Sequence, residues 1–201
     1  MVLKHVWGLF AHPKDEWTAI RDERCTVGKC YCSHVLILAA IPVVAYFIGT
    51  TQVGWQIGST SVKLAPRSAA IIALLTYLTM LVGVFSIGKA IHWMAPTYGS
   101  SQTLPQAIGL AAYVATPLWI VGAMFVYPVL WLNLLIALPA LAYTVYLLYT
   151  GLPVMMNVPE ERGFLYASSV LGVGLVMLVG VLAATVVLWS TGGIGPQFVG
   201  G

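Results

Sequence analysis

Long apolar runs separated by short polar segments dominate the chain. Five of these runs reach about 20 residues, the length that an α-helix needs to cross a hydrocarbon layer of roughly 30 Å. They cover residues 34–53, 68–91, 104–126, 129–150 and 164–189. Only Tyr127 and Pro128 separate the third run from the fourth, which favours an antiparallel hairpin. The pattern predicts an all-α polytopic membrane protein with a bundle of five transmembrane helices over residues 34–189.

The two ends of the chain depart from this pattern. Residues 1–33 are rich in charge, and we expect them to form a short amphipathic segment on the cytoplasmic surface. Four apolar residues near its start recur at helical spacing and predict an interfacial helix with this face in the membrane: Leu3, Val6, Trp7 and Phe10. Lys4 and His5 are expected to point away from that face. Residues 190–201 contain several glycines and are expected to form a flexible external tail.

Pro13 restarts the chain after the interfacial stretch and predicts the first turn of a second short helix. Its apolar side would consist of Trp17 and Ile20. We expect this helix to pack on the cytoplasmic face of the bundle.

Composition supports a membrane location and narrows the function. The chain has 201 residues, of which 60% are hydrophobic and 7% charged, whereas a soluble domain carries about a quarter charged residues. The nine Lys and Arg form no continuous basic surface, so no nucleic-acid partner is expected. The sequence contains no G-x-S-x-G, H-E-x-x-H or P-loop motif, and we expect no enzymatic activity.

The distribution of Lys and Arg predicts the orientation in the membrane. The side that carries the N-terminus has seven of them: Lys4, Lys14, Arg21, Arg24, Lys29, Lys89 and Arg162. The other side has only Lys63 and Arg67. The positive-inside rule therefore predicts a cytoplasmic N-terminus and, after five spans, a C-terminus outside. No cleavable export signal precedes the first apolar run, so we expect the N-terminus to be retained.

Ionisable and polar residues within the spans are few. No Asp or Glu lies in any span, which disfavours proton-coupled transport. The polar side chains that remain are expected to form hydrogen bonds between helices: Tyr77, Tyr113, Thr116, Asn133 and Tyr143. Small residues on one face of the last span predict close helix packing, either inside one subunit or between the subunits of a homodimer: Ser168, Gly172, Gly180 and Ala184.

All three cysteines and one histidine lie within ten residues just before the first span: Cys25, Cys30, Cys32 and His34. In a reducing compartment, clustered cysteines favour metal binding or redox chemistry over a disulfide. In an extended segment Cys30, Cys32 and His34 would share one face, and three sulfurs with one nitrogen suit zinc, or copper(I) as an alternative. The spacing is unlike that of zinc ribbons, and in a helix Cys30 and Cys32 would point apart. Structural or acylated cysteines therefore stay open as alternatives.

Five sequence blocks carry a family resemblance: residues 5–13, 48–52, 113–117, 127–131 and 146–153, which read HVWGLFAHP, IGTTQ, YVATP, YPVLW and YLLYTGLP. They resemble the Yip family of Ypt/Rab-interacting integral membrane proteins, in particular its bacterial inner-membrane members. The resemblance implies five spans and a cytoplasmic N-terminus in the bacterial inner membrane. Eukaryotic members bind Rab GTPases and carry an Asp-Leu-Tyr-Gly-Pro motif, of which only Tyr127 and Pro128 have a partial counterpart here. No Rab GTPase partner is therefore expected.

Three functional hypotheses follow from these observations. The leading one is a non-enzymatic membrane protein that binds zinc or copper through its cytoplasmic Cys/His segment. The second is a scaffold that organises the lipid bilayer or recruits a partner through the amphipathic stretch and the small-residue face. The third is a transporter or channel for a small solute or metal, which the absence of acidic residues in the spans disfavours.

Overall fold

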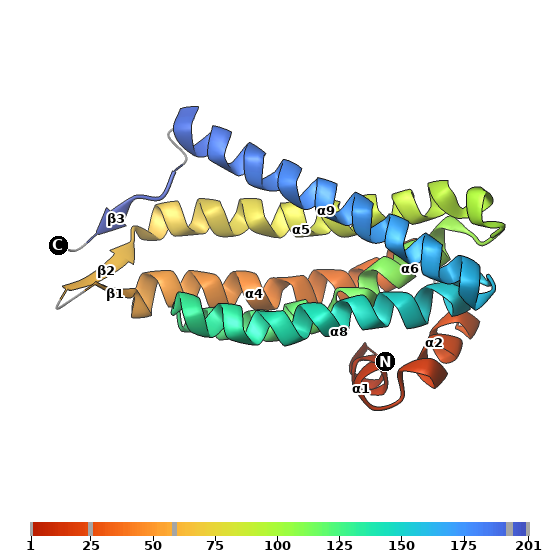
Figure 1. Cartoon of the computed structure of the whole chain (residues 1–201). Helices are drawn as coiled ribbons and strands as arrows, with labels where there is room; N and C mark the ends of the chain where they lie inside the picture. Colours follow the sequence, from red (N-terminus) through yellow and green to blue (C-terminus); the bar gives the residue numbers. More distant parts are fainter. Residues whose placement is uncertain (1, 24–25, 58–59, 192–194, 200–201) are drawn as a thin grey trace.

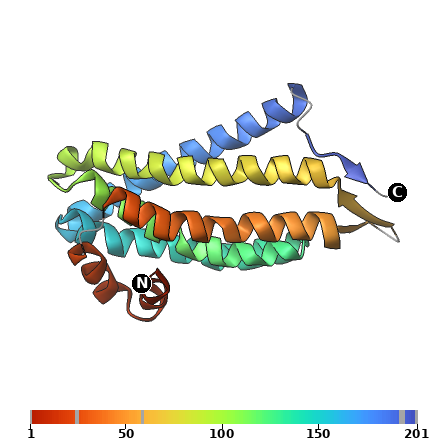
Figure 2. The same cartoon turned by 180° about the vertical axis from the view of Figure 1, so that it is seen from behind.

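A computed structural model describes residues 2–23, 26–57, 60–191 and 195–199. Five helical segments of this part of the chain are long and apolar enough to cross a membrane, which confirms the all-α polytopic class. They are Ser33–Val53, Pro66–Tyr98, Leu104–Val126, Leu130–Met156 and Glu160–Ser190. Figure 1 shows them side by side in an elongated bundle, with the two termini at opposite ends, as an odd number of spans requires. The reverse view in Figure 2 shows the same arrangement.

The first span is continuous despite an internal proline. It consists of a π-helical turn (Tyr31–Val35), α4 (Leu36–Ile48) and a second π-helical turn (Gly49–Val53). Pro42 lies within α4 and is buried where Gly122 of the third span packs against it. The hydroxyls of Thr50 and Thr51 donate to carbonyl oxygens one turn earlier, at 2.8 and 2.7 Å, so these polar groups are satisfied within the helix.

The third span is broken at a proline. α6 (Leu104–Val114) ends just before α7 (Thr116–Val121), and a 3₁₀ turn (Gly122–Val126) completes the span. Pro117 has no backbone N–H to continue the hydrogen bonds of α6, which explains the break at this position. The span begins with a capping box, in which the Thr103 backbone N–H donates to the Gln106 side chain at 2.9 Å.

The remaining spans are longer than the apolar runs indicate. α5 covers Pro66–Met94, α8 covers Leu130–Met156 and α9 covers Glu160–Thr191. α8 continues past Gly151 and Pro153 until Asn157, which adopts a left-handed conformation with φ of 51° and ends the helix. Glu160 and Glu161 extend α9 at its beginning, because carboxylates stabilise the positive end of the helix dipole.

A small sheet lies at the end of the bundle away from the N-terminus. β1 (Trp55–Ile57) and β2 (Thr60–Leu64) form a hairpin, and β3 (Phe198–Val199) pairs with β2 in antiparallel fashion. Residues 195–199 of the predicted tail thus contain a short strand, and the flexibility of the tail stays a prediction. The Ala65 N–H donates to the Gln197 carbonyl at 2.7 Å, and the Ser68 hydroxyl donates to Gly195 at 3.1 Å. The first hydrogen bond extends the pairing of β2 with β3 by one residue, and the second satisfies the backbone carbonyl of Gly195.

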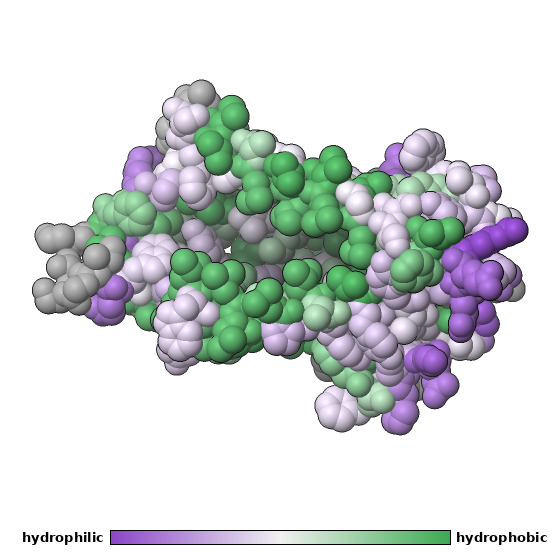
Figure 3. All heavy atoms as spheres, in the orientation of Figure 1, coloured by the Kyte–Doolittle hydropathy of each residue, from purple (hydrophilic) through white to green (hydrophobic). Residues whose placement is uncertain are grey.

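The buried core is concentrated towards the N-terminal end of the bundle. Its largest cluster joins α5, α6, α8 and α9 to two short N-terminal helices, α1 (Val2–Ala11) and α2 (Pro13–Asp22). In Figure 3 hydrophobic side chains cover the middle of the molecule, and the most hydrophilic residues gather around the N-terminal helices and the neighbouring helix ends. This distribution is the one expected of a bundle whose middle faces lipid.

Candidate functional site

The two N-terminal helices are fixed to the bundle by aromatic contacts. Trp17 and Ile20 of α2 are buried, as predicted, and the indole of Trp17 lies directly against Gly151 of α8. A Cβ atom at Gly151 would overlap the indole, so this helix contact requires glycine. On α1, the Tyr143 hydroxyl donates to the Leu9 carbonyl at 2.7 Å, and Phe10 stacks on Tyr143 with ring centroids 5.3 Å apart. The N-terminal helices are thus part of the folded core.

His5 lies at the centre of this contact. As expected, it points away from the exposed Trp7, but its side chain is buried, with only 4% of the residue exposed. Its Nδ1 lies 2.5 Å from Oε1 of Glu16, and its Nε2 lies 3.0 Å from Oε1 of Glu23. Two carboxylates from α2 and its C-terminal cap satisfy both ring nitrogens, which removes most of the cost of burial.

A line of buried rings continues from His5 into the membrane-spanning bundle. The ring of Tyr113 in α6 lies edge-on to His5 at 5.8 Å and next to the ring of His34 at 4.3 Å. The Nε2 of His34 shares a 2.9 Å hydrogen bond with the hydroxyl of Thr116. Among the described residues, the Nδ1 of His34 is buried without a hydrogen-bond partner. These contacts connect α1 to the first and third spans.

The Cys/His segment is helical rather than extended. Residues Val27–Cys30 form α3, and Tyr31–Val35 form the π-helical turn that leads into α4. Of the two backbones considered for this segment, the structure adopts the helical one and not the extended one. A helix satisfies its backbone hydrogen bonds within one segment, which is favourable at a membrane surface. Cys25 lies outside the described residues, as do the side chains of Cys30 and Cys32. No group of three His, Cys, Asp or Glu in the described part could hold a metal, and the zinc or copper site stays a prediction.

Only part of the predicted interfacial face of α1 is exposed in the structure. Trp7 is 76% exposed and Phe10 is 44% exposed, whereas Val6 is half-buried against the core. The side chain of Leu3 lies outside the described residues. Leu9, which the sequence analysis did not single out, is fully buried. Its spacing of four residues from His5 indicates the packed side of the helix.

Four of the five polar residues singled out in the spans form a hydrogen bond to another segment. The Tyr77 hydroxyl of α5 donates to the Leu36 carbonyl of α4 at 3.0 Å. Asn133 donates from Nδ2 to the Tyr127 carbonyl at 2.9 Å and so fixes the turn between the third and fourth spans. Thr116 and Tyr143 form the hydrogen bonds described above, and Tyr113 contacts the rings of His5 and His34. The Oδ1 of Asn133 is buried without a partner among the described residues.

The small-residue face of α9 is used only at one end within this chain. The hydroxyl of Ser168 shares a 2.9 Å hydrogen bond with the Tyr149 hydroxyl of α8. Gly172, Gly180 and Ala184 are exposed, so most of the row is free to face lipid or another helix. The homodimer stays a prediction.

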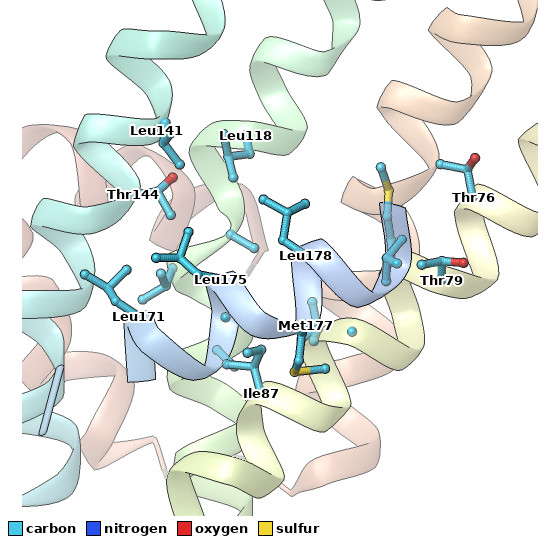
Figure 4. Close-up of a pocket in the computed structure, with 18 of the residues that line it drawn as sticks. Thr76, Thr79, Ile87, Leu118, Leu141, Thr144, Leu171, Leu175, Met177 and Leu178 are labelled. Atoms are coloured by element: carbon cyan, nitrogen blue, oxygen red, sulfur yellow. The ribbon is translucent and has the colours of Figure 1, made fainter. Parts of the chain in front are cut away.

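A second feature is a lateral cavity of about 710 Å³ between α5, α6, α8 and α9. Figure 3 shows the hollow between α9 and α8, and Figure 4 shows the leucine side chains that surround it. Apart from four threonines, its lining residues are apolar or aromatic. No pattern in the sequence identified this cavity, because it arises where α9 crosses the bundle obliquely rather than from residues close in sequence.

Five apolar helices with a docked N-terminal helix pair define an integral membrane protein of the polytopic helical class. A family model described as the Yip1 domain matches residues 7–181, and the chain therefore belongs to the Yip1 domain family. The chain is 44% identical over 191 residues to the inner membrane protein YohC of Escherichia coli strain K12, covering 94% of this chain and 98% of that protein. YohC of Escherichia coli O6:H1 strain CFT073 is similar to the same extent. No solved structure matches the chain.

Proposed function

We propose that this protein is a non-enzymatic scaffold of the bacterial inner membrane, which inserts α1 into the headgroup region of the cytoplasmic leaflet and thereby shapes the bilayer. The proposal rests on Trp7, which is 76% exposed on a helix whose opposite side is held by the buried His5 and Leu9. The five apolar helices and the similarity to inner membrane proteins support this location.

The physical basis is the preference of indole rings for the membrane interface. An exposed Trp on a mobile segment can turn away from water, but the contacts of His5 and Leu9 hold α1 in one orientation. Trp side chains are enriched at the headgroup level, where the apolar ring and the polar N–H are both satisfied. A helix that places such a side chain in one leaflet occupies headgroup area there, and its binding is sensitive to curvature.

The test compares two exposed tryptophans at the same end of the molecule. Trp7→Ala should remove the effect of the protein on vesicle size at a fixed ratio of protein to lipid, measured by cryo-electron microscopy of reconstituted vesicles. Trp93→Ala is the matched control, since Trp93 is 79% exposed on α5 and does not belong to α1. Equal behaviour of wild type and Trp7→Ala, or an equal loss in both variants, would show that α1 does not act as the proposed wedge.

A cysteine variant separates this function from metal binding. Replacing Cys25, Cys30 and Cys32 by serine should leave the vesicle effect unchanged, because α1 is anchored by residues outside that segment. Loss of the effect in the cysteine variant would instead favour the metal hypothesis.

A further inference from the structure

We propose that the lateral cavity between α5, α6, α8 and α9 binds one anionic phospholipid, with its acyl chains in the cavity and its phosphate near Lys63 and Arg67. This site is independent of the scaffold function proposed for α1. It involves other helices and the opposite end of the bundle, where the charge pattern predicts the outer leaflet.

The lining of the cavity selects an apolar occupant. Its volume of about 710 Å³ falls within the range of about 300–1,000 Å³ typical of ligand pockets. The hydroxyls of Thr79 and Thr185 already donate to carbonyl oxygens one turn earlier, each at 2.8 Å. The buried hydroxyl of Thr144 has no hydrogen-bond partner among the described residues, so the lining offers one isolated polar group. Water in such a space would lose most of its hydrogen bonds. The cavity lies between membrane-spanning helices, where acyl chains are the abundant apolar solvent.

The position of the charges selects an anionic headgroup. Four of the six Asp and Glu precede the first span, and the other two begin the fifth, so all six lie at the N-terminal end of the bundle. Lys63 and Arg67 are the only Lys and Arg in the segments at the other end. Neither forms an ion pair with a carboxylate in the part of the chain that the structure describes.

Depth along α5 relates Arg67 to the cavity. Arg67 is exposed in the first turn of α5, and Ile72, which lines the cavity, follows five residues later, a rise of about 7.5 Å. Five residues also turn the helix by about 140°, so Arg67 lies beyond this end of the cavity on a neighbouring face of α5, and its long side chain would have to reach round to a headgroup there. On the other wall, the partly exposed Trp189 of α9 lines the cavity. Tryptophan is typical of the headgroup level, so the cavity reaches the depth at which a phosphate would lie close to Arg67. An acyl chain could then extend towards Leu175 and Leu178, which Figure 4 shows projecting from α9.

Two glycines allow the cavity to be narrowed without disturbing the fold. A Cβ atom at Gly83 of α5 would meet nothing within 4 Å, and one at Gly174 of α9 would lie 3.8 Å from Ile87. Both glycines line the cavity. The double variant Gly83→Leu, Gly174→Leu therefore places two leucine side chains in it from opposite walls. The matched control is Gly172→Leu, Gly180→Leu, because both control positions are open and neither lines the cavity.

The experiment measures lipid that stays bound to the full-length protein. Each protein is purified in mild detergent, incubated with equal amounts of phosphatidylglycerol and phosphatidylethanolamine, and analysed by native mass spectrometry. Wild type and the control should retain one phosphatidylglycerol. The cavity variant should retain about 15-fold less, because each methylene excluded from an apolar site weakens binding about fourfold and at least two are displaced. Arg67→Gln should reduce the preference for phosphatidylglycerol about fivefold, the contribution of one basic residue at a membrane surface.

Three outcomes would overturn the proposal. The cavity variant could retain phosphatidylglycerol like wild type, or wild type could bind both lipids equally. A dimeric wild type that becomes monomeric in the cavity variant, with no change in bound lipid, would assign the cavity to a helix of a second copy. None of these outcomes alters the expected effect of Trp7→Ala on vesicles, so the two proposals fail separately.

Discussion

At the residue scale, the burial of His5 decides how α1 is attached. Its two carboxylate partners differ in their surroundings: the side chain of Glu16 is 15% exposed and that of Glu23 is 48% exposed. Gly8 lies so close to the Glu16 carboxylate that a Cβ atom would overlap it, which leaves little room for water on that side. The contact with Glu16 is therefore the one that stabilises the helix pair.

This difference predicts unequal effects of one substitution at two positions. Glu16→Gln should lower the free energy of unfolding by about 1–3 kcal/mol, because it weakens a largely buried charge-assisted hydrogen bond. Glu23→Gln should cost less than about 1 kcal/mol, as is usual for exposed pairs. Thermal unfolding in detergent, together with hydrogen exchange of α1, would measure both. Equal losses, or a larger loss for Glu23→Gln, would contradict the assignment.

The burial of His5 could not have been predicted from the sequence. Spacing correctly assigned His5 to the side of the helix opposite Trp7, but it does not show that this side packs against other residues. Its actual environment depends on Glu16 and Glu23, which a second helix brings back against α1. Trp17 and Ile20 were predicted correctly because their spacing defines a single apolar side in an otherwise polar helix.

At the element scale, length determined what could be predicted. Each span accumulates its apolar signal over about 20 residues, so all five were found despite the prolines within three of them. Short elements carry too little signal: for Val27–Val35 the sequence left an extended and a helical backbone open, and the structure is helical. The pairing of β3 with β2 joins segments more than 130 residues apart, and two residues of strand cannot specify such a partner.

The helical backbone of that segment sharpens the metal prediction. A helical backbone over Val27–Val35 agrees with the alternative in which the sequence spacing disfavours a shared ligand set, whereas an extended backbone would have favoured one. If the prediction is correct, elemental analysis of protein purified without chelator or metal-affinity resin gives about one zinc or copper per chain, because the four predicted ligands complete one tetrahedral site. The variant with Cys25, Cys30 and Cys32 changed to serine should lose it. Metal-free wild type would exclude the site.

At the scale of the whole molecule, the charges lie at the two ends and the apolar cavity lies between them. The acidic residues, the buried His5 contacts and the docked helices belong to the N-terminal end. The other end has two basic residues and the small sheet. This asymmetry assigns the two proposed lipid contacts to different leaflets, that of α1 to one and that of Arg67 to the other. Which of these is the cytoplasmic leaflet depends on the orientation of the bundle.

The orientation is therefore the last prediction, and a labelling experiment tests it directly. In a protein with the three native cysteines changed to serine, a single cysteine is introduced at Asp15 of α2 or at Gln56 of β1. Both residues are exposed, and they lie at opposite ends of the bundle. A membrane-impermeant maleimide should label Gln56→Cys in intact spheroplasts, whereas Asp15→Cys should react only after lysis, because seven Lys and Arg against two favour a cytoplasmic N-terminus. Labelling of Asp15→Cys in intact spheroplasts would show that the bundle has the opposite orientation in the membrane. The phospholipid near Arg67 would then belong to the cytoplasmic leaflet, and Trp7 would act on the periplasmic one.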